Sequence, residues 1–151
     1  MAERDADTIH SERRAHYDAA PEVIWASIEQ LPQYRSWWPW LRRFDAGGLA
    51  DGERWTCTVR PPLPYQVSFE LLLHDVVPAR SVAATIDGDI AGTARIELAP
   101  AGGGTDLTLV AEVRAASAFL RRLDRLAGPV ARYGHDHIID KALAQFADHA
   151  L

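Results

Sequence analysis

The chain has 151 residues, 48% of them hydrophobic and 25% charged, which is the balance of an ordinary globular domain. Its formal net charge of −5 argues against a nucleic-acid partner, because binding to phosphates needs clustered basic residues. Cys57 is the single cysteine, so an internal disulfide is excluded. We expect one domain over residues 1–151.

Targeting signals and metal-ligand patterns are both missing from the sequence. The charged N-terminal residues contain no apolar run, and no stretch approaches the roughly 20 apolar residues of a membrane helix. We therefore expect a cytoplasmic protein without integral membrane association. His135 and His137 diverge on a helix, and His10 and His16 lie far apart on a strand, so we expect no metal site. We also expect no cofactor.

The first predicted elements are a strand over 8–18 and two short helices. Pro21 suits the first position of a helix, where its missing N–H has no partner to lose. Pro32 is expected to end that helix, and a second one is predicted over 33–38, before Pro39. The apolar face of the first helix is predicted to contain Val23, Trp25, Ile28 and Leu31.

Four of the five tryptophans fall between Trp25 and Trp40. Trp25 lies within the first helix pattern and is expected in the core, where bulky aromatic residues dominate packing. The other three are too close together in the sequence for all of them to face one way. We expect Trp37, Trp38 or Trp40 to lie near solvent or at the mouth of a cavity, and Trp38 or Trp40 to contact a ligand.

From Leu41 onward the sequence alternates with a period of two, which is typical of antiparallel strands with one buried face. Glycine, proline and aspartate bound each run, and the glycines at 102–104 are expected at a hairpin tip. The pattern predicts six or seven strands in meander order. The apolar positions include Trp55, Cys57, Val59, Val67, Phe69, Leu71, Leu73, Ala94, Ile96, Leu98, Leu107, Leu109, Ala111 and Val113.

The last element is a long helix, predicted from Ser117, a suitable N-cap, to His149. Gly128 and Pro129 are expected to kink or break it. Its apolar face is predicted to contain His135, Ile138, Ile139, Ala142, Leu143 and Phe146. This element order predicts an α+β fold, with helices on one face of an antiparallel sheet. A gap between sheet and helix would form an apolar cavity.

Four segments carry a family resemblance that covers nearly the whole chain. They read Asp18-Ala-Ala-Pro-Glu-Val-Ile-Trp25, Leu31-Pro-Gln-Tyr-Arg-Ser-Trp-Trp-Pro-Trp40, Gly102-Gly-Gly-Thr-Asp-Leu-Thr-Leu109 and Gly134-His-Asp-His-Ile-Ile-Asp-Lys-Ala-Leu-Ala-Gln-Phe146. They resemble the START-like (SRPBCC) superfamily, which includes the polyketide cyclase/dehydrase and lipid-transport proteins. The resemblance implies a helix-grip fold, in which a curved antiparallel sheet of six to seven strands surrounds a long C-terminal helix.

The resemblance also implies an apolar cavity whose ligands are lipids, sterols, polyketides or quinones. We expect the chain to bind a small hydrophobic molecule of aromatic, polyketide-like or lipid-like character, as a monomer or homodimer. The expected ligand-binding residues are Trp38, Trp40, Trp55, Tyr65, Phe69, Leu71, His135 and Ile139.

Two alternatives remain open from the sequence. The first is an enzyme of cyclase or dehydratase type, in which His135 and Tyr65 are the candidate acid/base pair because histidine titrates near neutrality. The second is a protein-interaction module of the same fold. That module would have a filled interior and an exposed apolar patch near residues 37–40.

Overall fold

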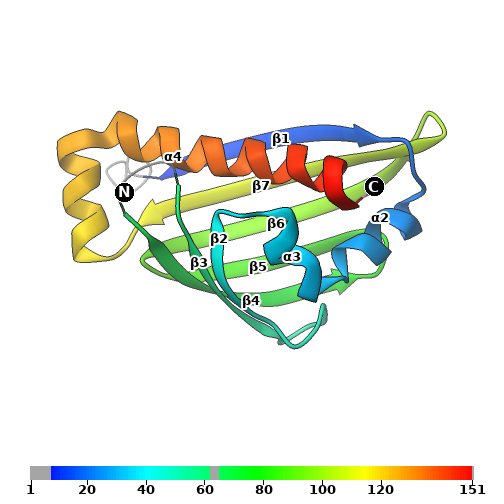
Figure 1. The fold of residues 1–151 in the computed structure, drawn as a ribbon, viewed down its shortest axis with the longest axis horizontal. Helices are drawn as coiled ribbons and strands as arrows, with labels where there is room; N and C mark the ends of the chain where they lie inside the picture. The colour runs from blue at the N-terminus through cyan, green and yellow to red at the C-terminus, as the bar shows by residue number, and fades with distance from the viewer. Residues whose placement is uncertain (1–7, 62–64, 151) are drawn as a thin grey trace.

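The computed structural model describes residues 8–61 and 65–150, and within its last helix the side chains at 124, 126–135, 149 and 150 lie outside that description. The chain folds into a curled sheet with a long helix across one face (Figure 1). The elements in chain order are β1 (Ile9–Tyr17), α2 (Pro21–Ile28), a 3₁₀ turn η1 (Leu31–Gln33), α3 (Tyr34–Trp37), β2 (Leu41–Asp45), β3 (Arg54–Val59), β4 (Val67–Val77), β5 (Ser81–Gly88), β6 (Ile90–Ala101), β7 (Gly104–Ala115) and α4 (Ala118–Ala150).

The sheet has seven strands in the order β1-β7-β6-β5-β4-β3-β2, and every neighbouring pair is antiparallel. The predicted meander is therefore confirmed for β2 to β7, including the hairpin tip between β6 and β7. β1 instead pairs with β7 at the far edge, with Tyr17 opposite Thr105. The segment containing α2, η1 and α3 carries the chain from one edge of the sheet to the other. This arrangement confirms the helix-grip fold.

The first helix differs from its prediction in its end and at one position of its buried face. Helix α2 stops at Ile28, before Pro32, which lies inside η1. Val23 was predicted in the core but is 51% exposed, whereas its neighbour Ile24 is fully buried. The spacing identified Trp25, Ile28 and Leu31 as buried but took Val23 in place of Ile24, because a helix of eight residues gives too few turns to define every position of its face. Trp25 is buried, as predicted.

Helix α4 begins as predicted, since the Ser117 hydroxyl accepts a hydrogen bond from the Leu120 N–H at 3.2 Å. It continues to Ala150 without a break, and Figure 1 shows it turning within its yellow-orange part before it runs along β1 and β7. A hydrogen bond joins α4 to β1, since the Nε of Arg13 on β1 donates to Oδ1 of Asp140 on α4 at 2.9 Å. Among the described residues, no helix combines the length and the apolar character that crossing a membrane requires.

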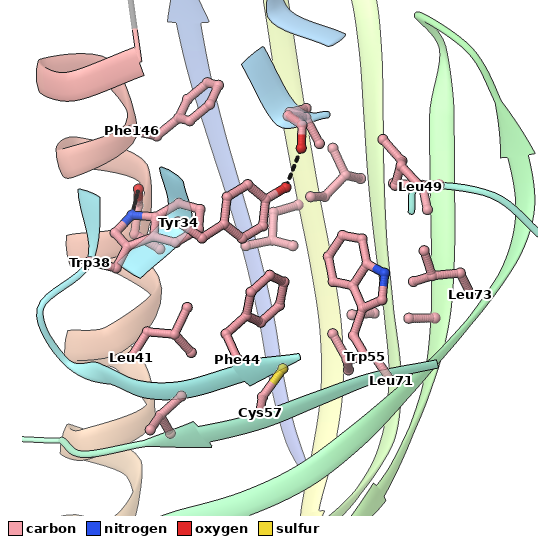
Figure 2. A pocket seen from close by; sticks show the side chains of 18 of the residues that line it. Tyr34, Trp38, Leu41, Phe44, Leu49, Trp55, Cys57, Leu71, Leu73 and Phe146 are labelled. Atoms are coloured by element: carbon pink, nitrogen blue, oxygen red, sulfur yellow. Dashed lines mark hydrogen bonds between the residues drawn. The ribbon is translucent and has the colours of Figure 1, made fainter. Parts of the chain in front are cut away.

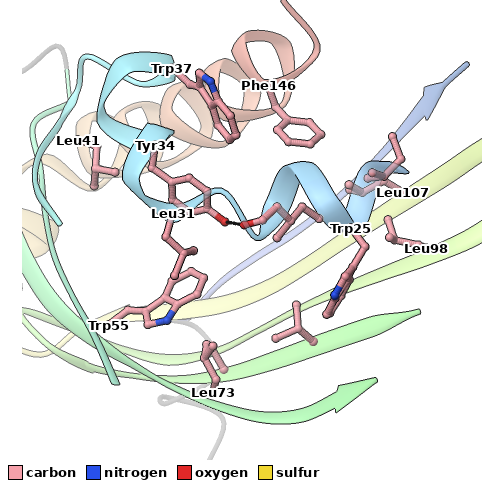
Figure 3. Close-up of a cluster of buried hydrophobic side chains, with 14 of the residues drawn as sticks. Trp25, Leu31, Tyr34, Trp37, Leu41, Trp55, Leu73, Leu98, Leu107 and Phe146 are labelled. Carbon is pink, nitrogen blue, oxygen red and sulfur yellow. Dashed lines mark hydrogen bonds between the residues drawn. The ribbon is translucent and has the colours of Figure 1, made fainter. Parts of the chain in front are cut away.

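The alternation of the strands produces one buried face and one solvated face. The buried face packs against α2, α3 and α4 around a cluster that includes Trp25, Trp37 and Phe146 (Figure 3). The opposite face carries charged pairs, such as Arg54 with Glu70 at 3.3 Å. The predicted buried face of the strands is therefore confirmed, and the apolar interior lies on the helix side of the sheet.

Candidate functional site: an apolar cavity under the last helix

A cavity of about 280 Å³ lies between the sheet, the α3–β2 segment and the C-terminal part of α4 (Figure 2). Its walls come from the sheet and from the helices α2, α3 and α4. The lining residues are Ile28, Tyr34, Trp38, Trp40, Leu41, Phe44, Leu49, Trp55, Cys57, Val59, Phe69, Leu71, Leu73, Val82, Ala83, Ala84, Ala94, Arg95, Ile96, Leu107, Leu109, Ala142, Leu143 and Phe146.

The space exists because the centre of the sheet presents small side chains. Ala84 of β5 is paired with Ala94 of β6, and both line the cavity together with Ala83. Protein interiors are normally packed as densely as organic crystals, so a row of alanines leaves space that larger neighbours must fill. Here the larger residues lie around the rim of the row, and the space above it stays open.

An aromatic wall forms one side of the cavity. Tyr34 is at its centre, with ring centroids 5.0 Å from Phe44, 4.8 Å from Trp38 and 5.9 Å from Trp55. The Phe44 contact is stacked, and the two tryptophan contacts are edge-to-face, which are the geometries that aromatic pairs prefer. Figure 2 shows these rings turned toward the same space. The wall offers a ligand flat apolar surfaces.

The polar atoms of the aromatic wall already have partners within the protein. The Trp38 indole Nε1 donates to the Ala142 carbonyl at 3.0 Å, and the Trp40 Nε1 donates to Gln145 Oε1 at 2.9 Å. The Trp55 Nε1 donates to the Gly48 carbonyl at 2.8 Å. The first two bonds also join the α3–β2 segment to α4, so they hold together one seam of the cavity.

Two further polar side chains of the lining also donate hydrogen bonds within the protein. The Tyr34 hydroxyl donates to the Ile28 carbonyl, and burial raises the pKa of this phenol. Arg95 has outward strand parity, and its Nε donates to Glu97 Oε1 at 2.6 Å on the solvated face. Within the part of the chain whose side chains are described, no three histidine, cysteine, aspartate or glutamate residues are grouped as a metal site.

Cys57 lies on the cavity wall and is buried. Burial raises the pKa of its thiol to about 12, because the apolar surroundings disfavour the thiolate. A thiol with this pKa is almost entirely protonated at neutral pH and is a poor nucleophile. These properties are those of a structural thiol and not of a catalytic nucleophile.

The structure brings five of the eight predicted ligand-binding residues together on the cavity wall. These are Trp38, Trp40, Trp55, Phe69 and Leu71. Their contact with a ligand stays a prediction.

The other three predicted residues do not lie on the described wall. Ile139 is buried but is not part of the lining. Tyr65 packs against Phe119, with ring centroids 6.2 Å apart, and is also not part of it. The side chain of His135 lies outside the described residues.

Sequence reasoning missed Tyr34 and Phe44, which complete the aromatic wall. Tyr34 lies in the tryptophan-rich segment, and that clustering was the available signal. Phe44 is on β2, a strand of five residues that is too short to give a clear alternation.

The fold and the cavity together define the class of protein. It is a helix-grip protein with an apolar cavity between the sheet and the C-terminal helix. Residues 8–150 match the sequence model of the polyketide cyclase / dehydrase and lipid transport family, and the chain belongs to this family. No curated protein is similar enough in sequence to count as a relative.

Solved structures with low sequence identity share the fold. A START superfamily protein from Mycobacterium smegmatis is 13% identical, with a TM-score of 0.72 over 93% of this chain and 96% of that one. The KanY protein is 17% identical, with a TM-score of 0.70 over 95% and 97% of the two chains. The ZhuI aromatase/cyclase from a Streptomyces species is 14% identical, with a TM-score of 0.70 over 93% and 90%. At these identities the likeness concerns the fold alone.

Proposed function

We propose that this protein binds a small hydrophobic molecule, aromatic in character, in the cavity between the sheet and α4. The observation that carries the proposal is the cavity itself, whose wall combines aliphatic strand residues with the rings of Tyr34, Trp38 and Trp55. Ligand sites are typically concave and mostly apolar, with volumes of about 300–1,000 Å³, and this cavity is near the lower end of that range.

The family description favours the cyclase alternative as much as ligand binding, but the described side chains add no support to either alternative. A cyclase or dehydratase needs an acid/base group within reach of its substrate. Of the pair considered for that role, Tyr65 lies off the cavity lining, and His135 has no described side chain. An interaction module was expected to have a filled interior and an exposed tryptophan patch, but Trp37 is buried and the interior contains a cavity.

The proposal is tested by titrating the protein with N-phenyl-1-naphthylamine, an uncharged probe whose fluorescence increases in apolar surroundings. We expect saturable binding with one probe per chain. In the variant Ala94→Leu the new side chain enters the cavity from β6, and we expect at least about tenfold weaker binding, since the added volume competes with the probe.

The matched control is Ala99→Leu, the same change at an exposed position of the same strand. Its affinity should equal that of the unaltered protein. The proposal fails if the probe does not saturate, or if both variants bind it as well as the unaltered protein does.

A further inference from the structure

A second hollow, which we call the arginine depression, lies on the solvated face of the sheet. Its volume is about 410 Å³, and most of its lining residues carry a charge or a hydroxyl group. They are Arg14, Arg80, Ser81, Arg95, Glu97, Leu98, Ala99, Asp106 and Thr108. The proposed hydrophobic binding makes no use of this surface.

The register of four strands places polar residues of the depression in one row. Arg14 of β1 is paired with Thr108 of β7, Thr108 with Glu97 of β6, and Glu97 with Ser81 of β5. Residues directly opposite each other on neighbouring strands point to the same face of a sheet. Since neighbouring strands lie about 4.8 Å apart, the row is roughly 14 Å long. Arg80 precedes Ser81, so the row has an arginine at each end.

The two carboxylates of the depression already have partners. Glu97 Oε1 accepts a hydrogen bond from Arg95 Nε at 2.6 Å. Asp106 Oδ1 lies 2.7 Å from Nδ1 of His16 in a second hydrogen bond. Both acidic groups are therefore paired with other basic groups and not with the arginines at the ends of the row.

Arg14 and Arg80 keep their guanidinium groups available. Both residues are exposed, and neither side chain has a hydrogen bond or an ion pair with any residue whose side chain the structure describes. A guanidinium group is always charged and presents N–H donors in a planar fork that matches the oxygens of an anion. Two positive charges thus face one depression without a protein counter-ion among those residues.

Ser81 gives an independent indication of a ligand. It is 8% exposed and lines the depression, and its hydroxyl has no hydrogen-bond partner among the described residues. No side-chain polar atom in the described part of the chain is both fully enclosed and unpaired, so the Ser81 hydroxyl is reachable from the depression. Buried polar groups are nearly always hydrogen-bonded, and this one can find its partner only outside the described chain.

We propose that the arginine depression binds a phosphate group through the guanidinium groups of Arg14 and Arg80 and the hydroxyls of Ser81 and Thr108. The donors come from both ends of the row and from its floor. A tetrahedral phosphate presents oxygens in all these directions, whereas a planar carboxylate presents only two. The double negative charge of a phosphate also balances the two unpaired arginines.

The test is an NMR titration of isotope-labelled protein with inorganic phosphate, at constant ionic strength and near neutral pH. We expect saturable shifts of the backbone amide signals of Ser81, Glu97 and Thr108. The amide signals of Trp38 and Phe44, at the apolar cavity, should stay unchanged. The absence of saturable shifts in the depression overturns the proposal and leaves hydrophobic binding in place.

Three substitutions test the assigned donors. We expect Arg14→Gln and Arg80→Gln each to weaken phosphate binding about tenfold or more, and Ser81→Ala about fivefold or more, because each removes a hydrogen bond to a charged group. The matched control is Arg114→Gln, the same change at an exposed position on the same face of β7, roughly 20 Å along the strand from Thr108. Its affinity should equal that of the unaltered protein.

The control separates a defined site from general attraction by positive charge. Equal weakening in Arg14→Gln and Arg114→Gln, both shown to be folded by their amide spectra, overturns the proposal. Sedimentation with phosphatidylcholine vesicles, with and without phosphatidic acid, then identifies the source of the phosphate. Binding to the phosphatidic acid vesicles that is lost in Arg14→Gln supports a lipid head group, and saturable phosphate binding without vesicle binding supports a soluble phosphate compound.

Discussion

Cys57 illustrates how the cavity changes the chemistry of a single residue. The thiol is 4% exposed, and the surrounding strand residues raise its pKa to about 12 from a usual value near 9. Because burial favours the neutral thiol, the folded state holds this proton more tightly than the unfolded state. The resulting stabilisation is complete below about pH 9 and is lost as the pH rises toward about 12.

This linkage predicts a measurable difference between the protein and its Cys57→Ala variant. Between pH 9 and 12 the free energy of unfolding should fall more steeply for the unaltered protein, by up to about 1.4 kcal/mol per pH unit. Urea unfolding at a series of pH values measures both slopes, and comparing slopes removes the constant effect of the smaller side chain. Identical slopes would show that the thiol is not held neutral by the fold.

At the scale of elements, the cavity walls differ in how they can open. The sheet wall is joined by continuous strand ladders, and opening it would break many backbone hydrogen bonds together. The seam between the α3–β2 segment and α4 is joined instead by side chains, through the indole bonds of Trp38 and Trp40 and the ring contact between Trp37 and Phe146. Low-stability contacts open most often, so we expect ligand exchange through this seam.

Removing the Gln145 side chain tests that expectation. Gln145→Ala deletes the acceptor of the Trp40 indole at the surface of α4, and we expect ligand dissociation to become about threefold to tenfold faster. Stopped-flow displacement of N-phenyl-1-naphthylamine measures the rate. Gln30→Ala, at an exposed position outside the seam, should leave it unchanged. Equal rates in both variants would place the exchange route elsewhere.

At the scale of the whole molecule, Phe146 connects elements that are far apart in the sequence. Its ring centroid lies 5.9 Å from that of Trp37 of α3 (Figure 3) and 5.6 Å from that of Tyr17 of β1, both in edge-to-face geometry. Phe146 also lines the cavity from α4. It is buried. One side chain therefore joins an edge strand, the tryptophan-rich segment and the last helix.

We expect Phe146→Ala to lower the free energy of unfolding by about 3–4 kcal/mol, because it removes buried aromatic contacts and enlarges an existing void. The same substitution at Phe119, which is 59% exposed near the start of α4, should change it by less than about 1 kcal/mol. Urea denaturation of both variants measures the difference. Similar losses at the two positions would mean that Phe146 does not connect the three elements.

Local patterns in the sequence were sufficient for the class of fold. Strand alternation, the glycine hairpin at 102–104 and the Ser117 cap each depend on residues close together in the chain, and the structure agrees with all three. On α2 the spacing identified Trp25 and Ile28 as buried but took Val23 in place of Ile24, because a helix of eight residues repeats too few times to define its face completely.

The cavity wall was only partly predictable, because it depends on contacts between distant segments. Alternation placed Trp55, Phe69 and Leu71 on the inner face, and all three line the cavity. It could not show that Tyr65 packs against Phe119 instead, since the end of a strand can turn either way.

The sequence by itself determined the family, the fold class and the inward face of the strands, since each follows from local composition and spacing. Only the tertiary structure decided that the tryptophan-rich segment forms a cavity wall and that its donors are already paired. The physical reason is that a hydrogen bond such as that from Trp38 to Ala142 joins residues 104 positions apart. No local pattern encodes such a pairing, which arises only when the sheet curls and α4 closes over it.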